Sequence, residues 1–95
     1  MKNKPRTFYV YILKNKDGNS NRLYIGSTNN LEKRLEEHRN KKVFSTKRFP
    51  DFELVYYEAY ISESDARMRE KRLKYFGKAY QELKKRIMGG LEGAG

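Results

Sequence analysis

Two strand-like segments separated by a tight-turn signal constrain the fold of this chain more than any other feature of its sequence. Residues 7–14 are rich in aromatic and β-branched side chains, and residues 22–26 resume this pattern after a polar stretch. The dipeptide Asp17-Gly18 lies in that stretch, and it is a strong signal for the turn of a β-hairpin. The sequence therefore predicts an antiparallel hairpin early in the chain.

The register of this hairpin decides which side chains meet. A turn at the predicted dipeptide pairs Tyr11 with Tyr24 and Tyr9 with Gly26. Because side chains alternate along a strand, Tyr11 and Tyr24 then project from the same sheet face as near neighbours. An ordinary aromatic pair in the core of a sheet would have the same pattern, since tyrosine is common in strands. The pair alone therefore does not indicate a function.

The later elements follow from capping and turn residues. Asn29 followed by Glu32 fits a capping box, and Ser62 followed by Asp65 marks another helix start. After the hairpin we expect a helix to about Arg39, a basic loop over 40–50, a strand over 52–60, a helix from Ser62 and, beyond Gly77, a helix over 79–88. This order of strand, strand, helix, strand, helix and helix predicts an α+β fold.

The composition bounds the kind of protein. The 95 residues correspond to a single domain, 1–95, for which we expect a core over about 7–88 and flexible ends at 1–6 and 89–95. The absence of cysteine excludes disulfides and thiolate metal sites, and it fits a reducing cytosol. The longest apolar run has six residues, far short of the ~20 that span a membrane. We therefore expect a cytoplasmic protein with no membrane partner.

Basic residues outnumber acidic ones and gather in two stretches. The chain has 22 Lys and Arg against 12 Asp and Glu, which gives a formal net charge of +10. Residues 41–48 hold four basic side chains and no acid, and residues 67–86 hold nine basic side chains. Such clusters follow a phosphate backbone and release its counterions on binding. A solvated face that keeps a protein soluble has a similar composition, but a polyanion is the expected partner.

The first predicted helix carries polar residues on its apolar side. At about 100° per residue, Arg34 and His38 share the arc occupied by Leu31 and Leu35. A helix built only to pack would fill this arc with apolar residues, and a charge held against a core must be paired or used. Two interpretations stay open: a functional pair facing the sheet, or side chains at the edge of the apolar stripe that extend to water.

The second predicted helix holds one isolated acid. Glu70 lies about 40° from Ala66 on the helical wheel, and it is the one acidic residue between Arg67 and Lys78. It could be a surface partner of Lys74, four residues later. A single carboxylate in a basic field is also what a hard divalent cation needs when phosphate and water complete its shell. The sequence leaves both interpretations open.

Taken together, these residues resemble the signature of the GIY-YIG endonuclease family. The matching groups are, in chain order, Tyr9-Val10-Tyr11, then Tyr24-Ile25-Gly26-Ser27-Thr28-Asn29-Asn30-Leu31, then Arg34 and His38, then Glu70. The resemblance covers about Phe8 to Lys74 and looks closest to the small stand-alone bacterial members. The chain departs from the pattern in two places. Tyr9 replaces the glycine of the first half of the motif, and no asparagine follows Asn40, whereas some members carry one after the metal-binding glutamate.

The resemblance implies a three-stranded antiparallel sheet flanked by helices, with the active site on one sheet face. It also implies a hydrolase that cuts DNA with Mg²⁺ or Mn²⁺ held by Glu70. Arg34 would bind the scissile phosphate through its planar donors, and Tyr11 would orient or deprotonate the attacking water with Tyr24 opposite it. His38 would hold or relay the proton. Which of Tyr11, Tyr24 and His38 is the general base stays open.

Further residues are expected to support this centre. Gly26 would let the backbone approach the site closely, and Phe44 would stack on an unpaired base. The expected contacts to the nucleic-acid backbone are Lys41, Lys42, Lys47, Arg48, Lys71, Arg72 and Lys74. No small-molecule cofactor is expected, and the oligomeric state stays open.

The favoured function is a divalent-metal-dependent endonuclease acting on structured or single-stranded DNA in repair or recombination. A non-catalytic nucleic-acid-binding module that retains the nuclease fold is the alternative. A basic structural protein of the ribosome is a third reading of the same charge.

Overall fold

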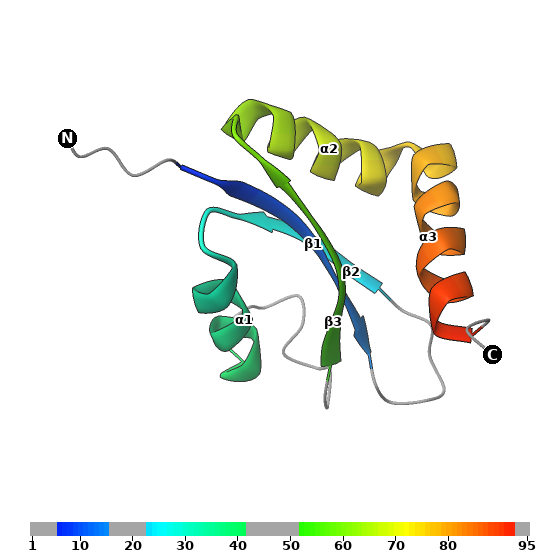
Figure 1. Cartoon of the computed structure of the whole chain (residues 1–95), viewed down its shortest axis with the longest axis horizontal. Helices are drawn as coiled ribbons and strands as arrows, with labels where there is room; N and C mark the ends of the chain where they lie inside the picture. The colour runs from blue at the N-terminus through cyan, green and yellow to red at the C-terminus, as the bar shows by residue number, and fades with distance from the viewer. Residues whose placement is uncertain (1–5, 16–22, 42–51, 93–95) are drawn as a thin grey trace.

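The computed structural model of the chain describes residues 6–15, 23–41 and 52–92, and within them it has three strands and three helices (Figure 1). In chain order they are β1 (Phe8–Asn15), β2 (Leu23–Thr28), α1 (Leu31–Arg39), β3 (Phe52–Tyr60), α2 (Glu63–Tyr75) and α3 (Gly77–Glu92). The predicted α+β fold and its order of elements are confirmed.

The strands form one antiparallel sheet in the order β2-β1-β3, so β1 is the central strand and β2 and β3 are the edges. Figure 1 shows α1 on one side of this sheet and α2 and α3 on the other. Alternation along β1 supplies both layers, because Val10 and Ile12 project toward α2 and α3 while Tyr11 and Leu13 project toward α1. All four of these side chains are fully buried.

The hairpin register differs from the predicted one by two residues. Tyr11 pairs with Gly26, and Tyr24 pairs with Leu13, so the predicted pairing of Tyr11 with Tyr24 and of Tyr9 with Gly26 is wrong. The side-chain period of a strand is two, and a slip of two residues therefore leaves every side chain on its original face. Tyr11 and Tyr24 are diagonal neighbours on the α1 side, with ring centroids 6.1 Å apart. The turn that sets this register lies outside the described residues.

The hydrophobic core lies between the sheet and the helices α2 and α3. It contains Val10, Ile12 and Ile25 from the sheet and Ala66, Leu73, Leu83 and Ile87 from the helices. The α1 side is different in character, because its buried residues include polar aromatic groups. The chain therefore places its apolar burial on one face and keeps the other face for a polar cluster.

The helix boundaries follow the caps with two corrections. Ser62 caps α2 through the Asp65 amide, as predicted. Asn30, not Asn29, caps α1, because its side chain accepts a hydrogen bond from the amide of Lys33. The last helix begins at Gly77 and continues to Glu92, past its predicted end and into the stretch expected to be a flexible tail. Within the described ranges, no helix is both long and apolar enough to cross a membrane.

Candidate active site

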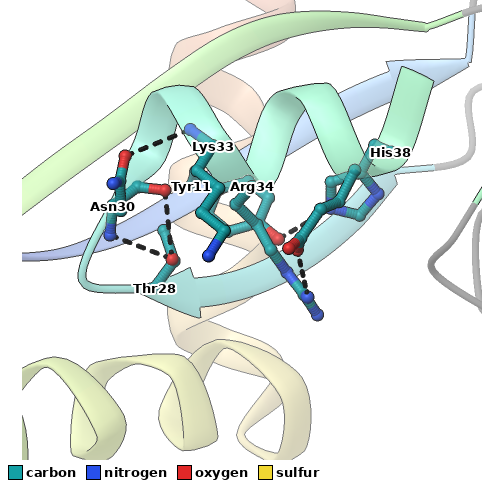
Figure 2. A network of polar contacts seen from close by, with 7 residues as sticks. Tyr11, Thr28, Asn30, Lys33, Arg34 and His38 are labelled. Atoms are coloured by element: carbon teal, nitrogen blue, oxygen red, sulfur yellow. Dashed lines mark hydrogen bonds and ion pairs between the residues drawn. The ribbon is translucent and has the colours of Figure 1, made fainter. Parts of the chain in front are cut away.

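A buried tyrosine–histidine pair lies between β1 and α1. The Tyr11 hydroxyl and His38 Nε2 are 2.8 Å apart, and both side chains have 0% exposed surface (Figure 2). The helical arc that the sequence shared between leucines, Arg34 and His38 therefore does face the sheet. His38 belongs to the buried cluster and does not extend to water, so this alternative is excluded for the histidine.

Gly26 is required by the position of the Tyr11 ring. A Cβ atom on Gly26 would lie 2.6 Å from the Tyr11 hydroxyl oxygen and 2.7 Å from Cζ, closer than real Cβ atoms approach other atoms. Because Gly26 pairs directly with Tyr11 across the two strands, its missing side chain gives the phenol room to lie over β2. The motif glycine thus makes space for a side chain, whereas the sequence suggested a close approach of the backbone.

Tyr24 is the tyrosine of the cluster that reaches the surface. Its ring lies 5.1 Å from the His38 ring and 6.1 Å from that of Tyr11, and the residue is only partly buried. Phe52 closes the other side of the His38 ring at 5.8 Å. The cluster therefore has a sealed inner pair, Tyr11 and His38, and one outer phenol.

Arg34 lies at the mouth of the cluster. Its Nη1 donates to Glu37 Oε1 at 2.9 Å, and the side chain keeps 37% of its surface exposed. Its Nε is buried and has no hydrogen-bond partner among the residues that the structure describes. A buried donor of this kind calls for a further acceptor, such as water or an anion. The neighbouring Tyr11 and Glu37 side chains raise the pKa of Arg34, which keeps the guanidinium charged.

Burial sets the protonation of the inner pair. Desolvation raises the pKa of Tyr11, although the neighbouring Arg34 opposes the shift. Desolvation and the positive charge of Arg34 together lower the pKa of His38 to about 4. Both groups are therefore neutral around pH 7. The inner pair is a neutral hydrogen-bonded unit, not a ready phenolate or imidazolium.

Glu70 approaches the cluster from the other side of the edge strand β2. It projects from α2, and its Oε1 accepts a hydrogen bond of 2.6 Å from Ser27 while its Oε2 lies 2.8 Å from Lys74 Nζ. Ser27 follows Gly26 in β2, so its side chain points away from the face on which the Tyr11 ring lies over Gly26. The expectation of a site on a single sheet face is therefore wrong, and the polar residues lie around the edge of β2.

Two neighbouring grooves connect the two halves of this arrangement. The first, of about 330 Å³, is lined by residues from the end of β2, from α1 and from α2, with Arg34 among them. The second, of about 350 Å³, is lined by Glu70, Lys71, Lys74 and Tyr75. Ser27 and Arg67 line both grooves.

The sequence analysis assigned no role in the site to Ser27 or Arg67. Ser27 directly follows the Tyr24-Ile25-Gly26 motif, and Arg67 lies three residues before Glu70 on the same helix face. Their spacing from the motif residues would have indicated them.

The ligand set around Glu70 limits which metal could bind. Among the described residues, no group of three or more His, Cys, Asp or Glu side chains comes together. This arrangement does not suit a metal that takes three or four protein ligands, such as zinc. It fits Mg²⁺ or Mn²⁺, because Mg²⁺ keeps several waters and takes one or two carboxylates with phosphate oxygens.

The residues predicted to hold the nucleic-acid backbone divide into three groups. Lys71 and Lys74 line the Glu70 groove, and Arg72 is exposed on the same helix but lines neither groove. Lys41 is exposed just beyond α1, with a left-handed φ of 61°. Lys42, Phe44, Lys47 and Arg48 lie outside the described residues.

The model of the GIY-YIG catalytic domain family matches residues 7–81, which contain every site residue described above. With this match, the small α+β fold that gathers tyrosines, an arginine and a carboxylate around one edge strand is a nuclease-type domain. The chain belongs to the GIY-YIG family, and the resemblance drawn from its motifs is confirmed.

Its relatives are small proteins of similar length. The chain is 40% identical over 78 residues to a UPF0213 protein of Oceanobacillus iheyensis, covering 80% of this chain and 85% of that protein. It is 43% identical over 77 residues to a UPF0213 protein of Staphylococcus haemolyticus, covering 80% and 89%. The fold is similar to the solution structure of a UPF0213 protein from Bacillus halodurans, with a TM-score of 0.51, 28% identity, and 92% and 86% of the two chains covered.

Proposed function

We propose that this protein is an endonuclease that hydrolyses DNA phosphodiesters with one divalent metal ion. One observation carries the proposal. Two adjacent residues of β2, Gly26 and Ser27, hold the buried tyrosine on one side of the strand and the Glu70 carboxylate on the other. A phosphate at this edge would therefore meet Arg34 and Glu70 together, although they belong to helices on opposite faces of the sheet.

Each polar residue then has a distinct task. Arg34 would bind a non-bridging oxygen of the scissile phosphate, because its Nε needs an acceptor and its planar fork suits phosphate. Glu70 would hold the metal ion. Ser27 would keep its hydrogen bond to Oε1, and Lys74 would move away from Oε2 to make room for the metal. Mg²⁺ or Mn²⁺ would stabilise the charge that develops on the phosphate and lower the pKa of a bound water.

Tyr24 is the better candidate for the group that orients the attacking water. Tyr11 has no exposed surface, and burial raises its pKa, and both properties favour another group for the task predicted for Tyr11. Tyr24 is partly exposed and stands against the Tyr11–His38 pair. We assign Tyr11 and His38 to positioning Tyr24 and Arg34.

The expected substrate is DNA with unpaired or branched segments, as arises in repair and recombination. The net charge of +10 and the basic residues along the Glu70 groove support a nucleic-acid partner. The basic residues along the Glu70 groove would contact phosphates, so recognition would rest on the backbone and on strand structure.

A non-catalytic nucleic-acid-binding module is the second candidate. It is favoured by the ion pair between Lys74 and Glu70, because the lysine takes a carboxylate oxygen that a metal ion would need. Metal binding would have to displace an ammonium whose side chain is 39% exposed. A flexible, part-exposed lysine can make that exchange, so we favour the enzyme.

The test is a cleavage assay with duplex, single-stranded and branched DNA, with and without Mg²⁺ or Mn²⁺. Glu70→Gln and Arg34→Ala should each lower the cleavage rate by about 100-fold or more, because each removes a group that stabilises transition-state charge. Asp65→Asn on the same helix is the matched carboxylate control, because Asp65 is exposed and lines neither groove, and it should retain full rate. If every protein, wild type included, binds DNA equally and none cuts it, the binding module is correct and the enzyme proposal fails.

A further inference from the structure

An aromatic pair with one exposed ring lies on the sheet beside the candidate active site. Tyr57 of β3 is the direct cross-strand partner of Tyr11, and the two side chains project from the same face. Tyr57 is 53% exposed, whereas Tyr11 is fully buried. The Tyr9 ring meets the Tyr57 ring edge to face, with centroids 6.0 Å apart. We call Tyr9 and Tyr57 the tyrosine platform.

We propose that the tyrosine platform stacks an unpaired base of a single-stranded DNA segment that crosses the sheet next to the candidate active site. The path of this DNA segment, from the β2 edge toward Tyr57, rests on the proposed function, which puts a phosphate at the β2 edge. The platform lies on the opposite side of Tyr11 from Gly26, since β1 is flanked by β2 and β3. At about 4.8 Å per strand spacing, the β2 edge and Tyr57 lie roughly 10 Å apart.

The helix on this face leaves the platform uncovered. The C-terminal part of α1 closes over the other half of the cluster, where the His38 ring contacts Tyr24 and Phe52. Tyr57 is the one tyrosine of β3 that is more than half exposed. Tyr56 and Tyr60 lie on the other face of the strand, where each donates a hydrogen bond of 2.6 Å to Glu58. A large ring held on a rigid strand but left in water is the form of a stacking surface.

Tyr9 makes the pair. It stands where the GIY-YIG signature has a glycine, a position with no side chain to offer. In this chain the Tyr9 ring packs against the Tyr57 ring in a T-shaped contact, and Tyr57 still keeps 53% of its surface exposed. The substitution thus adds an aromatic surface next to a motif tyrosine.

The charge around the platform selects a nucleic acid as the occupant. Tyr9 pairs with Thr28 at the end of β2, where the first groove is lined by Lys33, Arg34 and Arg67 together with Glu37 and Glu63. This lining has a net positive charge, so a chain that covers both the groove and the platform should carry negative charge and planar apolar groups. A base-paired duplex keeps its bases stacked inside, and only an unpaired base can lie on a tyrosine ring. Single-stranded DNA fits both requirements.

The experiment measures binding without metal, so that no cleavage intervenes. A thymidine oligonucleotide, an abasic oligonucleotide of equal length and a duplex are titrated with wild type, Tyr57→Leu, Tyr57→Phe and Phe76→Ala. Phe76 is a matched exposed aromatic, 59% exposed, at the end of α2. Leu keeps an apolar strand residue while removing the ring, and thermal unfolding checks that each variant is folded.

Tyr57→Leu should weaken binding of the thymidine strand by roughly 5-fold or more, the loss of one base–aromatic stack. Its binding to the abasic strand and to the duplex should stay within about 2-fold of wild type, and Tyr57→Phe and Phe76→Ala should behave like wild type. Equal losses for the thymidine and abasic strands, or no loss for either, would overturn the platform.

This result is independent of catalysis. Base-dependent binding through Tyr57 in a protein that cuts nothing would keep the platform and refute the endonuclease. Cleavage by a protein whose Tyr57→Leu variant binds all three ligands normally would do the reverse.

Discussion

Two carboxylates near opposite edges of the sheet have different surroundings. Glu58, on the edge strand β3, accepts hydrogen bonds of 2.6 Å from both Tyr56 and Tyr60 and a two-pronged contact from Arg69, at 3.0 and 2.9 Å. Burial alone would raise the pKa of Glu58, but the bonds from these three donors lower it overall. This carboxylate is saturated by groups on fixed elements, and it ties α2 to the sheet.

Glu70 has fewer and looser partners. It holds Ser27 of β2 and one part-exposed lysine, Lys74, and it lines an open groove. Arg69 and Glu70 are consecutive in α2, so one turn of the helix anchors to β3 through the first and reaches β2 through the second. The contrast teaches that a carboxylate among basic residues is structural when all its acceptor sites are taken, and is available to a ligand when a part-exposed lysine pairs with one of its oxygens.

The largest expected effect comes from filling the space that Gly26 leaves for the Tyr11 ring. Gly26→Ala should lower cleavage by about 100-fold, because the new Cβ displaces the Tyr11 phenol by an ångström or more. Overpacking should also cost roughly 1–3 kcal/mol of unfolding free energy. Gly77→Ala is the matched control, since nothing lies within 4 Å of its added Cβ. Full activity in Gly26→Ala would show that Tyr11 does not matter to the site.

The next effect is a pH signature of the buried pair. The pKa of His38 falls from 6.5 in the unfolded chain to about 4 in the fold, so the unfolded state binds the extra proton first. The stabilisation from neutral His38 is complete above the unfolded pKa and is lost as pH falls toward 4. Between about pH 7 and about pH 5 the wild type should lose up to about 2 kcal/mol from this group. The unfolding free energy of His38→Gln, measured in urea, should not show this loss between the two pH values. If it falls with pH as steeply as that of the wild type, another group is responsible for the titration.

A smaller effect tests Glu58 as a structural anchor. Glu58→Gln should lower the unfolding free energy by about 1–2 kcal/mol, because it leaves part-buried Arg69 without its counter-charge. Cleavage per folded molecule should persist. Since the pKa of Glu58 is lowered, its contribution is present above the ordinary value of 4.5 and is lost below it. Glu63→Gln, from a pair with 72% and 53% exposed side chains, should change stability by less than about 0.5 kcal/mol.

The smallest effect concerns the groove beside Glu70. Lys71→Ala should reduce the slope of log affinity against log salt concentration by about 1, the signature of one lost phosphate contact. Lys85→Ala removes an exposed lysine of α3 that lines neither groove, and it should leave the slope unchanged. Equal slopes for the two variants would move the DNA path away from the Glu70 groove.

The sequence by itself determined the elements and most of the cluster. The strand alternation and the Ser62 cap predicted the order of elements, and the helical arc predicted that Arg34 and His38 share the apolar side of their helix, although it left open whether they face the sheet or water. These signals depend on neighbours a few residues apart, whose geometry is fixed by backbone periodicity. The same periodicity explains why Tyr11 and Tyr24 share a face although the predicted register was two residues out.

Only the tertiary structure decided which groups are sealed and which are open. The burial of Tyr11, the room that Gly26 leaves for it, and the saturation of Glu58 but not Glu70 arise from residues far apart in the chain. Solvation and hydrogen-bond saturation depend on what surrounds a group in space, and no periodicity along the chain encodes them. For that reason the polar residues could be predicted from the sequence, whereas their arrangement around the edge strand β2, with Tyr24 partly exposed and Tyr11 buried, follows from the fold.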